Sequence, residues 1–199
     1  MMAAGRRGGS AVDWESIARG MIDGVTEFEI PAGFTLTPNI ESMYRDRKGL
    51  TNVVIQEGVT SIGSNAFQNC TSLATVTLPS TLTEIKQYAF YNCPLTSITI
   101  PEGVTIIGGN AFYKPLFTRF VIPSTVVTTG NYFITQGTNL DELVMLPTTP
   151  PTLNGVNVNT WGKATWKLYV PDASLNDYKT AQNWSSFASR TYPISDLPT

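Results

Sequence analysis

The sequence predicts an α/β repeat fold, a right-handed solenoid built mainly from a parallel β ladder. Three observations predict it: a motif that returns five times, the small size of each unit, and a composition rich in Thr, Asn, Gly and Pro. A unit this short cannot bury its own apolar side chains, so neighbouring units must stack. The five units begin 23, 22, 22 and 23 residues apart, at Leu50, Leu73, Leu95, Phe117 and Leu140.

Each unit opens with a short strand, because its apolar residues fall at offsets that a half-buried strand places on one face. Strands of successive units are expected side by side, about 4.8 Å apart. Pro79, Pro101 and Pro123 follow three of the strands and end the pairing, since proline has no N–H. The inward positions are Leu50, Val53, Ile55; Leu73, Val76, Leu78; Leu95, Ile98, Ile100; Phe117, Phe120, Ile122; and Leu140, Leu143, Met145.

The second part of each unit is an arm that returns the chain, which we expect to be a short helix or irregular. It carries a second inward set: Val59, Ile62, Phe67; Leu82, Ile85, Phe90; and Val104, Ile107, Phe112. We expect Phe67, Phe90 and Phe112 to stack as an aromatic spine, which Tyr132 and Phe133 continue less regularly.

The strings EGVTSIGSNAFQNCTSL and PSTLTEIKQYAFYNCPLTSITIPEGVTIIGGNAF resemble the BspA-type leucine-rich repeat. The resemblance covers about residues 50–146 and implies a leucine-rich-repeat solenoid. Its usual role in that family is adhesion at the surface of gut bacteria. Two departures stand out: Lys114 and Pro115 replace an Asn-Cys pair, and the fourth unit has Thr-Gly in place of Ile-Gly.

The two ends of the chain differ from the repeats. Residues 1–24 are expected to form a flexible segment and a short helix that begins at Asp13, residues 25–147 the solenoid, and residues 148–199 a C-terminal cap. The first coil is degenerate: Ile30 and Pro31 match Ile100 and Pro101, and Tyr44 takes the place of Phe67. Both WESIARGMIDGVTEFEIP and the terminal segment resemble parts of repeat proteins from gut bacteria and their phages.

The cap is predicted as one strand, WKLYVP, and one amphipathic helix laid across the last coil to shield it. Asp172 would be the N-cap of that helix, with Leu175, Tyr178, Ala181 and Trp184 on its inner face. Trp161, Trp166 and Trp184 gather in this region. They are expected to pack the cap onto the last coil, and the alternative is that they contact sugars or a partner.

Composition excludes several classes of function. The net charge is −2 with a charged fraction of 14%, too balanced for binding nucleic acid or anionic lipid electrostatically. The chain has no histidine, which removes the commonest general base and metal ligand, so we expect no enzyme, no metal and no cofactor. No segment approaches the roughly 18 apolar residues of a membrane span, and no export signal follows Met1. The sequence therefore predicts a soluble protein.

Cysteine and carboxylate side chains offer little chemistry. Cys70 and Cys93 occupy equivalent places in adjacent coils, where they are expected to be buried and inert, although a disulfide or a reactive thiol stays open. Glu57 and Glu102 share one turn position with Ser80 between them, and we expect their carboxylates to be solvated.

The outward positions of the strands form the one ordered surface that the repeat creates by itself. A rigid, low-charge face of Thr, Val and Asn is a candidate docking surface, since side chains held by a ladder lose little entropy on binding. The alternative is a purely structural face, because Thr and Val suit exposed strands. The first row is Asn52, Thr75, Ser97, Arg119 and Glu142, and the second is Val54, Thr77, Thr99, Val121 and Val144.

The function predicted from these observations is non-enzymatic binding of a protein or cell-surface glycan, with no nucleic acid and no membrane insertion. One hypothesis places the module on a phage particle, where a missing export signal would be expected. Another makes it a surface or secreted adhesin of a gut bacterium, and a third a structural scaffold. Trp14, Ile17 and Met21 have no place in the solenoid core, so they are predicted to mediate homo-oligomerisation or attachment to a larger assembly.

Overall fold

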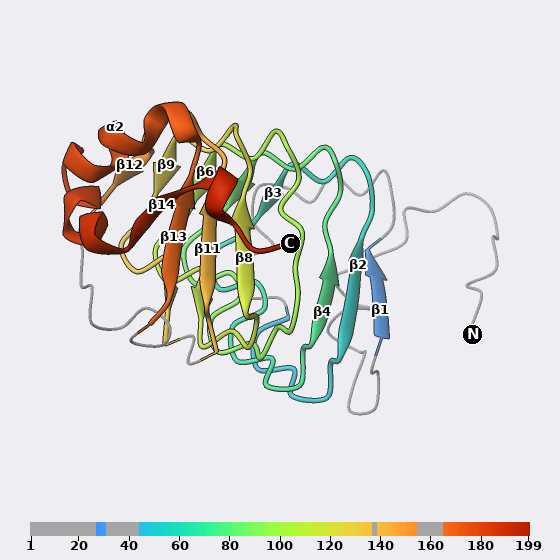
Figure 1. Ribbon diagram of the computed structural model, residues 1–199. Coiled ribbons are helices and arrows are strands. Elements are labelled where there is room, and N and C mark those ends of the chain that lie inside the picture. The colour runs from blue at the N-terminus through green and yellow to red at the C-terminus, as the bar shows by residue number, and fades with distance from the viewer. Residues whose placement is uncertain (1–26, 31–43, 137–138, 155–164) are drawn as a thin grey trace, which may run out of the picture.

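The chain folds as a stack of coils, as the repeat predicts (Figure 1). The computed structural model describes residues 27–30, 44–136, 139–154 and 165–199. Most coils contribute one strand to the face toward the viewer of Figure 1, and all pairings between these strands are parallel. The strands are β1 (Glu27–Ile30), β2 (Asn52–Ile55), β4 (Thr75–Thr77), β8 (Arg119–Ile122), β11 (Glu142–Met145), β13 (Lys167–Val170) and β14 (Thr191–Pro193).

The degenerate first coil contributes a strand to this ladder, as expected. β1 pairs with β2 in a register that sets Glu27 against Asn52 and Ile30 against Ile55. The predicted equivalence of Ile30 with the inward isoleucines of later coils is therefore confirmed at the level of the backbone.

The ladder is interrupted in the third coil. Its strands form two sheets, in the orders β1-β2-β4 and β14-β13-β11-β8. Residues 96–100 lie between them and join β4 through one bridge, from Thr75 to Ser97. Leu78 and Ile98, inward positions on either side of this bridge, are only partly buried. The predicted continuous ladder thus exists as two segments.

A second parallel ladder runs along the arms. The arms are irregular instead of helical, and each carries a two-residue strand that the sequence analysis did not identify. In spatial order these strands are β3 (Ser61–Ile62), β5 (Glu84–Ile85), β6 (Ile106–Ile107), β9 (Thr128–Thr129) and β12 (Thr152–Leu153). Two further short strands, β7 (Phe112–Tyr113) and β10 (Ile134–Thr135), pair with one another.

The third side of each coil is a turn, and we call the stack formed by residues 64–69, 87–92, 109–114 and 131–136 the turn face. Its backbone amides donate to the following coil, as from Phe67 N to Ala89 O at 2.8 Å. Ladder amides donate to the preceding coil instead, as from Lys86 N to Ile62 O at 2.9 Å. Positive φ angles at repeated positions of the turns accompany this reversal, as at Asn69, Asn92 and Lys114.

The aromatic spine is confirmed and begins one coil earlier than its phenylalanines. Ring centroids lie 5.2 Å apart between Tyr44 and Phe67, 5.3 Å between Phe67 and Phe90, and 5.6 Å between Phe90 and Phe112. The expectation for the fourth unit was wrong by one residue. Ile134 pairs with Phe112 and continues the spine.

Phe133 instead takes the place that small residues hold in the other coils. Its carbonyl accepts from Phe112 N at 2.8 Å, as the carbonyl of Ala111 accepts from Phe90 N at 2.9 Å. Tyr132 accordingly lies on the turn face, where its φ is 55°. The hydrogen bonds between adjacent coils set their register, and this register decides which side chain enters the spine.

The cap contains the predicted strand, β13, but its helix is broken. Asp172 lies inside the 3₁₀ helix η2 (Asp172–Ser174) and is not an N-cap. The chain continues as α2 (Leu175–Thr180) and, after a positive φ at Asn183, as the 3₁₀ helix η3 (Trp184–Arg190). The last strand β14 and the 3₁₀ helix η4 (Ile194–Asp196) follow, neither of which was expected.

Buried hydrogen bonds dock the helical part of the cap, residues 172–190, onto residues 147–153. The Tyr178 hydroxyl donates to Pro147 O at 2.9 Å, and Trp184 Nε1 donates to Pro151 O at 2.7 Å. Trp166 packs edge-on against Phe187 with centroids 5.4 Å apart. Trp166 and Trp184 therefore do pack the cap, whereas Trp161 lies outside the described residues.

The predicted N-terminal helix also lies outside the described residues, with Trp14, Ile17 and Met21. The boundaries 1–24, 25–147 and 148–199 stay a prediction. None of the helices in the described ranges combines the length and the hydropathy of a membrane span.

Candidate functional site

The ladder face is the outward surface of β1, β2, β4, residues 96–100, β8, β11, β13 and β14. The strand pairings confirm that residues of each predicted row lie opposite one another. Asn52 pairs with Thr75, Thr75 with Ser97, and Arg119 with Glu142. In the second row, Val54 pairs with Thr77 and Val121 with Val144.

The N-terminal half of this face is open. Thr75, Thr77, Ser97 and Thr99 are exposed, with Asn52 and Val54 half-buried beside them. The Thr75 hydroxyl donates to Asn52 Oδ1 at 2.7 Å, which fixes both side chains across two strands. We call these six residues the open half.

The C-terminal half is covered from β11 onward, and one predicted site residue is thereby corrected. Val144 is only 3% exposed, and Tyr169, its partner in β13, is 1% exposed. The chain after β14 passes in front of β11 and β8 (Figure 1). We call residues 194–199 the tail. Val144 is consequently part of the interior and is not available to a ligand.

Polar contacts at both ends hold the tail in place. At its start, Ser195 N donates to Asp172 Oδ1 at 3.1 Å, and this bond lowers the pKa of the Asp172 carboxyl. Further along, Arg119 Nη2 donates to Pro198 O at 2.9 Å while Arg119 Nε pairs with Glu142. The two charged members of the first row are therefore engaged with one another and with the tail.

The cap extends both rows with residues that the sequence analysis missed. Lys167 pairs with Glu142 in register, and Tyr169 continues the second row to Tyr192. Lys167 Nζ lies 5.2 Å from the centre of the Tyr192 ring. Aligning Leu168 with Leu143 would have identified Lys167 and Tyr169, but nothing periodic marks Tyr192.

The turn carboxylates are exposed but have structural partners, contrary to the expectation of purely solvated side chains. Glu57 accepts from Ser80 N at 2.8 Å, from the Ser80 hydroxyl at 2.9 Å and from Thr81 N at 3.3 Å. Hydrogen bonds from the Ser80 backbone and hydroxyl hold the pKa of Glu57 below its ordinary value. Glu102 repeats the arrangement with the amide and hydroxyl of Ser124.

The two cysteines are free and buried, which confirms the expected burial and excludes a disulfide between them. Each thiol donates to a backbone carbonyl of the preceding coil, Cys70 to Tyr44 O at 3.0 Å and Cys93 to Phe67 O at 2.9 Å. Burial raises the pKa of the Cys93 thiol, so its reactive thiolate is disfavoured.

Three or more His, Cys, Asp or Glu side chains do not converge anywhere in the described part of the chain in a way that would hold a metal ion. The open half of the ladder face presents hydroxyl, amide and apolar groups, and Arg119, Glu142 and Lys167 add charge further along.

Comparison with known proteins agrees with the fold. The family described as BspA type leucine rich repeat region matches residues 39–152 in six copies. A leucine-rich repeat protein of T. pallidum is 28% identical with a TM-score of 0.52, covering 64% of this chain and 56% of its own. One from Eubacterium ventriosum is 26% identical with a TM-score of 0.57, covering 76% and 39%.

A third solved structure, a leucine-rich repeat protein from Bacteroides ovatus, is 18% identical with a TM-score of 0.51 and supports the fold alone. It covers 76% of this chain and 49% of its own. The chain therefore spans between 39% and 56% of the length of these relatives. No curated protein matches the sequence.

Proposed function

Because the chain belongs to the BspA-type leucine-rich-repeat family, we propose that it is a non-enzymatic binding or adhesion module that recognises a protein or a glycan through the open half. Leucine-rich-repeat domains generally mediate protein binding. The observation that carries the proposal is the line of exposed hydroxyl side chains at Thr75, Thr77, Ser97 and Thr99, held on a parallel backbone.

Physical chemistry favours this surface over the rest of the ladder face. β-branched threonines have few rotamers to lose, and the bond from Thr75 to Asn52 already fixes part of the row. Hydroxyl groups both donate and accept, which suits polar partners such as sugars and peptide groups. The covered half offers no comparable surface, because the tail occupies it.

A non-enzymatic role is supported by the absence of histidine from the sequence and of converging acid and base groups from the described residues. The carboxylates with lowered pKa values, Glu57 and Asp172, are each committed to hydrogen bonds with neighbouring serine residues.

The test is a whole-cell and glycan-array binding screen with the full chain, with and without Thr77→Lys and Thr99→Lys. We expect both variants to lose binding, because a lysine on either position obstructs the open half. Val127→Lys is the matched control, since Val127 is 60% exposed next to β9 in the second ladder. Binding that survives both threonine changes, or that Val127→Lys removes equally, contradicts the proposal.

We also propose a carrier for the module, either a bacterial cell surface or a phage particle. Antibody detection of the chain on intact cells, compared with purified virions from induced cultures, separates the two. Attachment or self-association through Trp14, Ile17 and Met21 is a further part of this proposal. Light scattering of the full chain and of a chain that begins at residue 25 should then give different multiples of the chain mass.

A further inference from the structure

A groove of about 320 Å³ lies at the corner where the turn face meets the ladder. Two columns of equivalent positions in successive coils line it. Asn92, Lys114 and Gln136 form one column, at the end of the turns. The other column contains Thr71, Pro94 and Leu116, just before the ladder strands. Its volume is at the small end of the range for ligand sites.

The groove lies where the third unit departs from the repeat. In the preceding coils the first column is a chain of side-chain amides: Asn69 Nδ2 donates to Asp46 Oδ1 at 2.8 Å, and Asn92 Nδ2 donates to Asn69 Oδ1 at 3.2 Å. Lys114 ends this chain. Lys114 does not donate to Asn92, so among the described residues the carbonyl oxygen of Asn92 is left for another donor.

Lys114 is also held in a backbone conformation that asparagine tolerates better. Its φ is 60°, in the left-handed region, where Asn69 and Asn92 occupy the same repeat position. Gln136 repeats this conformation at the same position with a φ of 56°, so it belongs to the turn and is not peculiar to Lys114.

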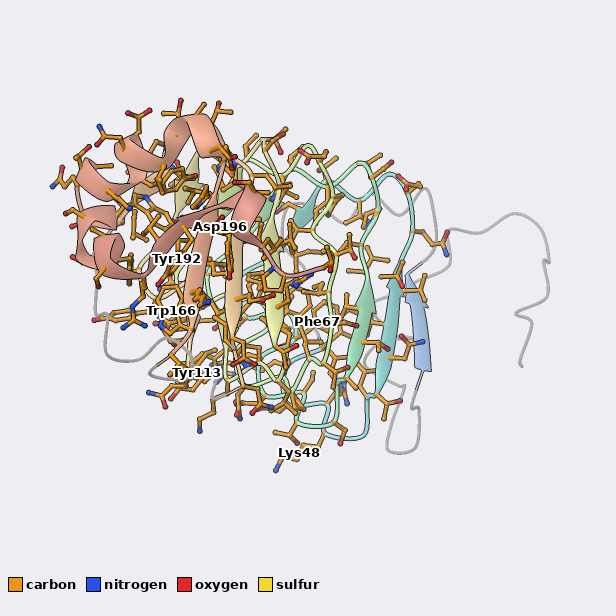
Figure 2. All side chains as sticks on the ribbon, in the orientation of Figure 1. Lys48, Phe67, Tyr113, Trp166, Tyr192 and Asp196 are labelled. Carbon is orange, nitrogen blue, oxygen red and sulfur yellow. The ribbon has the colours of Figure 1, made fainter. Side chains whose placement is uncertain are left out.

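The ammonium group of Lys114 lies near the Tyr113 ring and has no carboxylate partner among the described residues. Its Nζ lies 5.5 Å from the centre of the Tyr113 ring, and Tyr113 stacks on Tyr91 with centroids 4.2 Å apart. Figure 2 shows Tyr113 at the lower edge of the stack. Between residues 44 and 136, the ion pair present is that of Arg45 with Asp46, which does not involve Lys114.

The floor of the groove is apolar. Pro94 is half-buried, Pro115 is buried at the base of the groove, and Leu116 is 41% exposed, a large apolar side chain left in contact with water. Covering such a side chain with the C–H face of a ligand is favourable.

Backbone groups in the groove are already used between coils. Asn92 N donates to Tyr113 O, Lys114 N to Thr135 O and Leu116 N to Leu95 O, each at 2.8 Å. A peptide strand binds mainly through free backbone groups, so this groove does not suit one. What remains for a ligand is side-chain amides, one cation and an apolar floor.

We propose that this groove binds a sugar that carries a carboxylate. The ring lies with its C–H face on Pro94, Pro115 and Leu116, its hydroxyls hydrogen-bond to Asn92 and Gln136, and its carboxylate pairs with Lys114. The site is separate from the open half, so the two proposals stand or fall independently.

The test uses methyl β-D-glucuronide and methyl β-D-glucoside, which differ only in a carboxylate against a hydroxymethyl group. Each is titrated into the full chain while amide shifts are followed by NMR. We expect the glucuronide to shift the amides of Asn92, Lys114 and Gln136. We expect the glucoside to bind about fivefold more weakly, the effect of one exposed ion pair at the upper end of its range.

Two variants locate the effect. Lys114→Gln should remove the preference for the glucuronide, and Leu116→Asn should weaken both sugars. Lys167→Gln is the matched control, because Lys167 is also exposed and also lies over a tyrosine ring, on the ladder face. It should leave both titrations unchanged.

Several results would overturn the proposal: equal affinity for the two sugars, shifts confined to other residues, or an equal loss in Lys167→Gln. An acetylated glutamate peptide that binds as tightly as the glucuronide would also overturn it, because the groove would then recognise carboxylates and not sugars. Thr77→Lys should bind both sugars normally, whatever the outcome for the open half.

Discussion

The two halves of the ladder face share one backbone arrangement and differ in what lies on them. The cover begins between β8 and β11, because Val121 and Val144 are neighbours in the same row, yet Val121 is 40% exposed and Val144 3%. In the open half, hydroxyl side chains face outward without a covering segment from the described residues. In the covered half, the tail and the added strands β13 and β14 turn equivalent positions into interior (Figure 1).

Strand register decides where a side chain points, whereas its exposure depends on whether residues from further along the sequence pack over it. A row identified from the repeat alone therefore predicts side-chain orientation and not solvent exposure. It becomes a binding surface only where nothing else packs on it. Four substitutions test this difference between the covered and the open positions.

Val144→Lys should separate the halves most strongly. The change places an ammonium group in a buried site without a partner, and we expect a loss of about 3 kcal/mol or more in the free energy of unfolding. Val121→Lys, in the same row, should cost less than about 0.5 kcal/mol. Urea denaturation measures both, and similar losses would show that Val144 is not covered.

Tyr178→Phe tests how far the covered half depends on the cap. Loss of the hydroxyl leaves Pro147 O without its donor, which should cost about 1 to 2 kcal/mol. Burial raises the pKa of Tyr178 above its ordinary value of 10.0, so the neutral form stabilises the fold. Stability should then fall as the pH rises above that value, because the unfolded chain ionises first.

The comparison of Tyr178→Phe with the unchanged chain isolates this residue, since burial also raises the pKa of Tyr44 to about 12 in both. Thermal unfolding between pH 8 and pH 11 provides the measurement. Parallel curves for the two chains would contradict the assignment.

Arg119→Ala should loosen the tail without unfolding the ladder. It removes the donor to Pro198 O and the partner of Glu142, at an expected cost of about 1 kcal/mol or less. Hydrogen exchange should quicken at Leu197, whose amide donates to Ile194 O. Thr75→Val is the counterpart in the open half, and it should leave exchange at Leu197 unchanged.

Glu57→Gln is the smallest change, and its effect depends on pH. The folded carboxyl has a lowered pKa, so its contribution is present above its ordinary value of 4.5 and is lost as the pH falls through the folded value. The stability difference between Glu57→Gln and the unchanged chain should therefore shrink from pH 6 toward pH 3. A difference that stays constant over that range would sink the assignment.

Much of the solenoid could be predicted from the sequence because the same inward positions recur in successive units. The spine of Phe67, Phe90 and Phe112 needed only the alignment of units. The prediction for the fourth unit was wrong because two aromatic residues, Tyr132 and Phe133, precede the spine position. Only the pairing between coils shows that Ile134 fills it.

The candidate site was predictable in direction and not in extent. Thr77 and Thr99 are where the pattern puts them, on exposed strand positions. The tail that buries Val144 has no periodicity, and its anchor, the bond from Arg119 to Pro198, joins residues 79 apart in the sequence. No local sequence pattern predicts a contact between residues so far apart.

The paired turns also constrain how such a chain can change in length. Glu57 and Glu102 each accept hydrogen bonds from a Ser-Thr turn in the next coil. The coil between them has Ser80 at the equivalent position and no glutamate. Duplication of a single glutamate-bearing coil would set one carboxylate against another, and the first of the two would lose the serine hydroxyl that donates to it. The duplicable module is therefore a pair of coils, and engineered or evolved extensions of this protein should add coils two at a time.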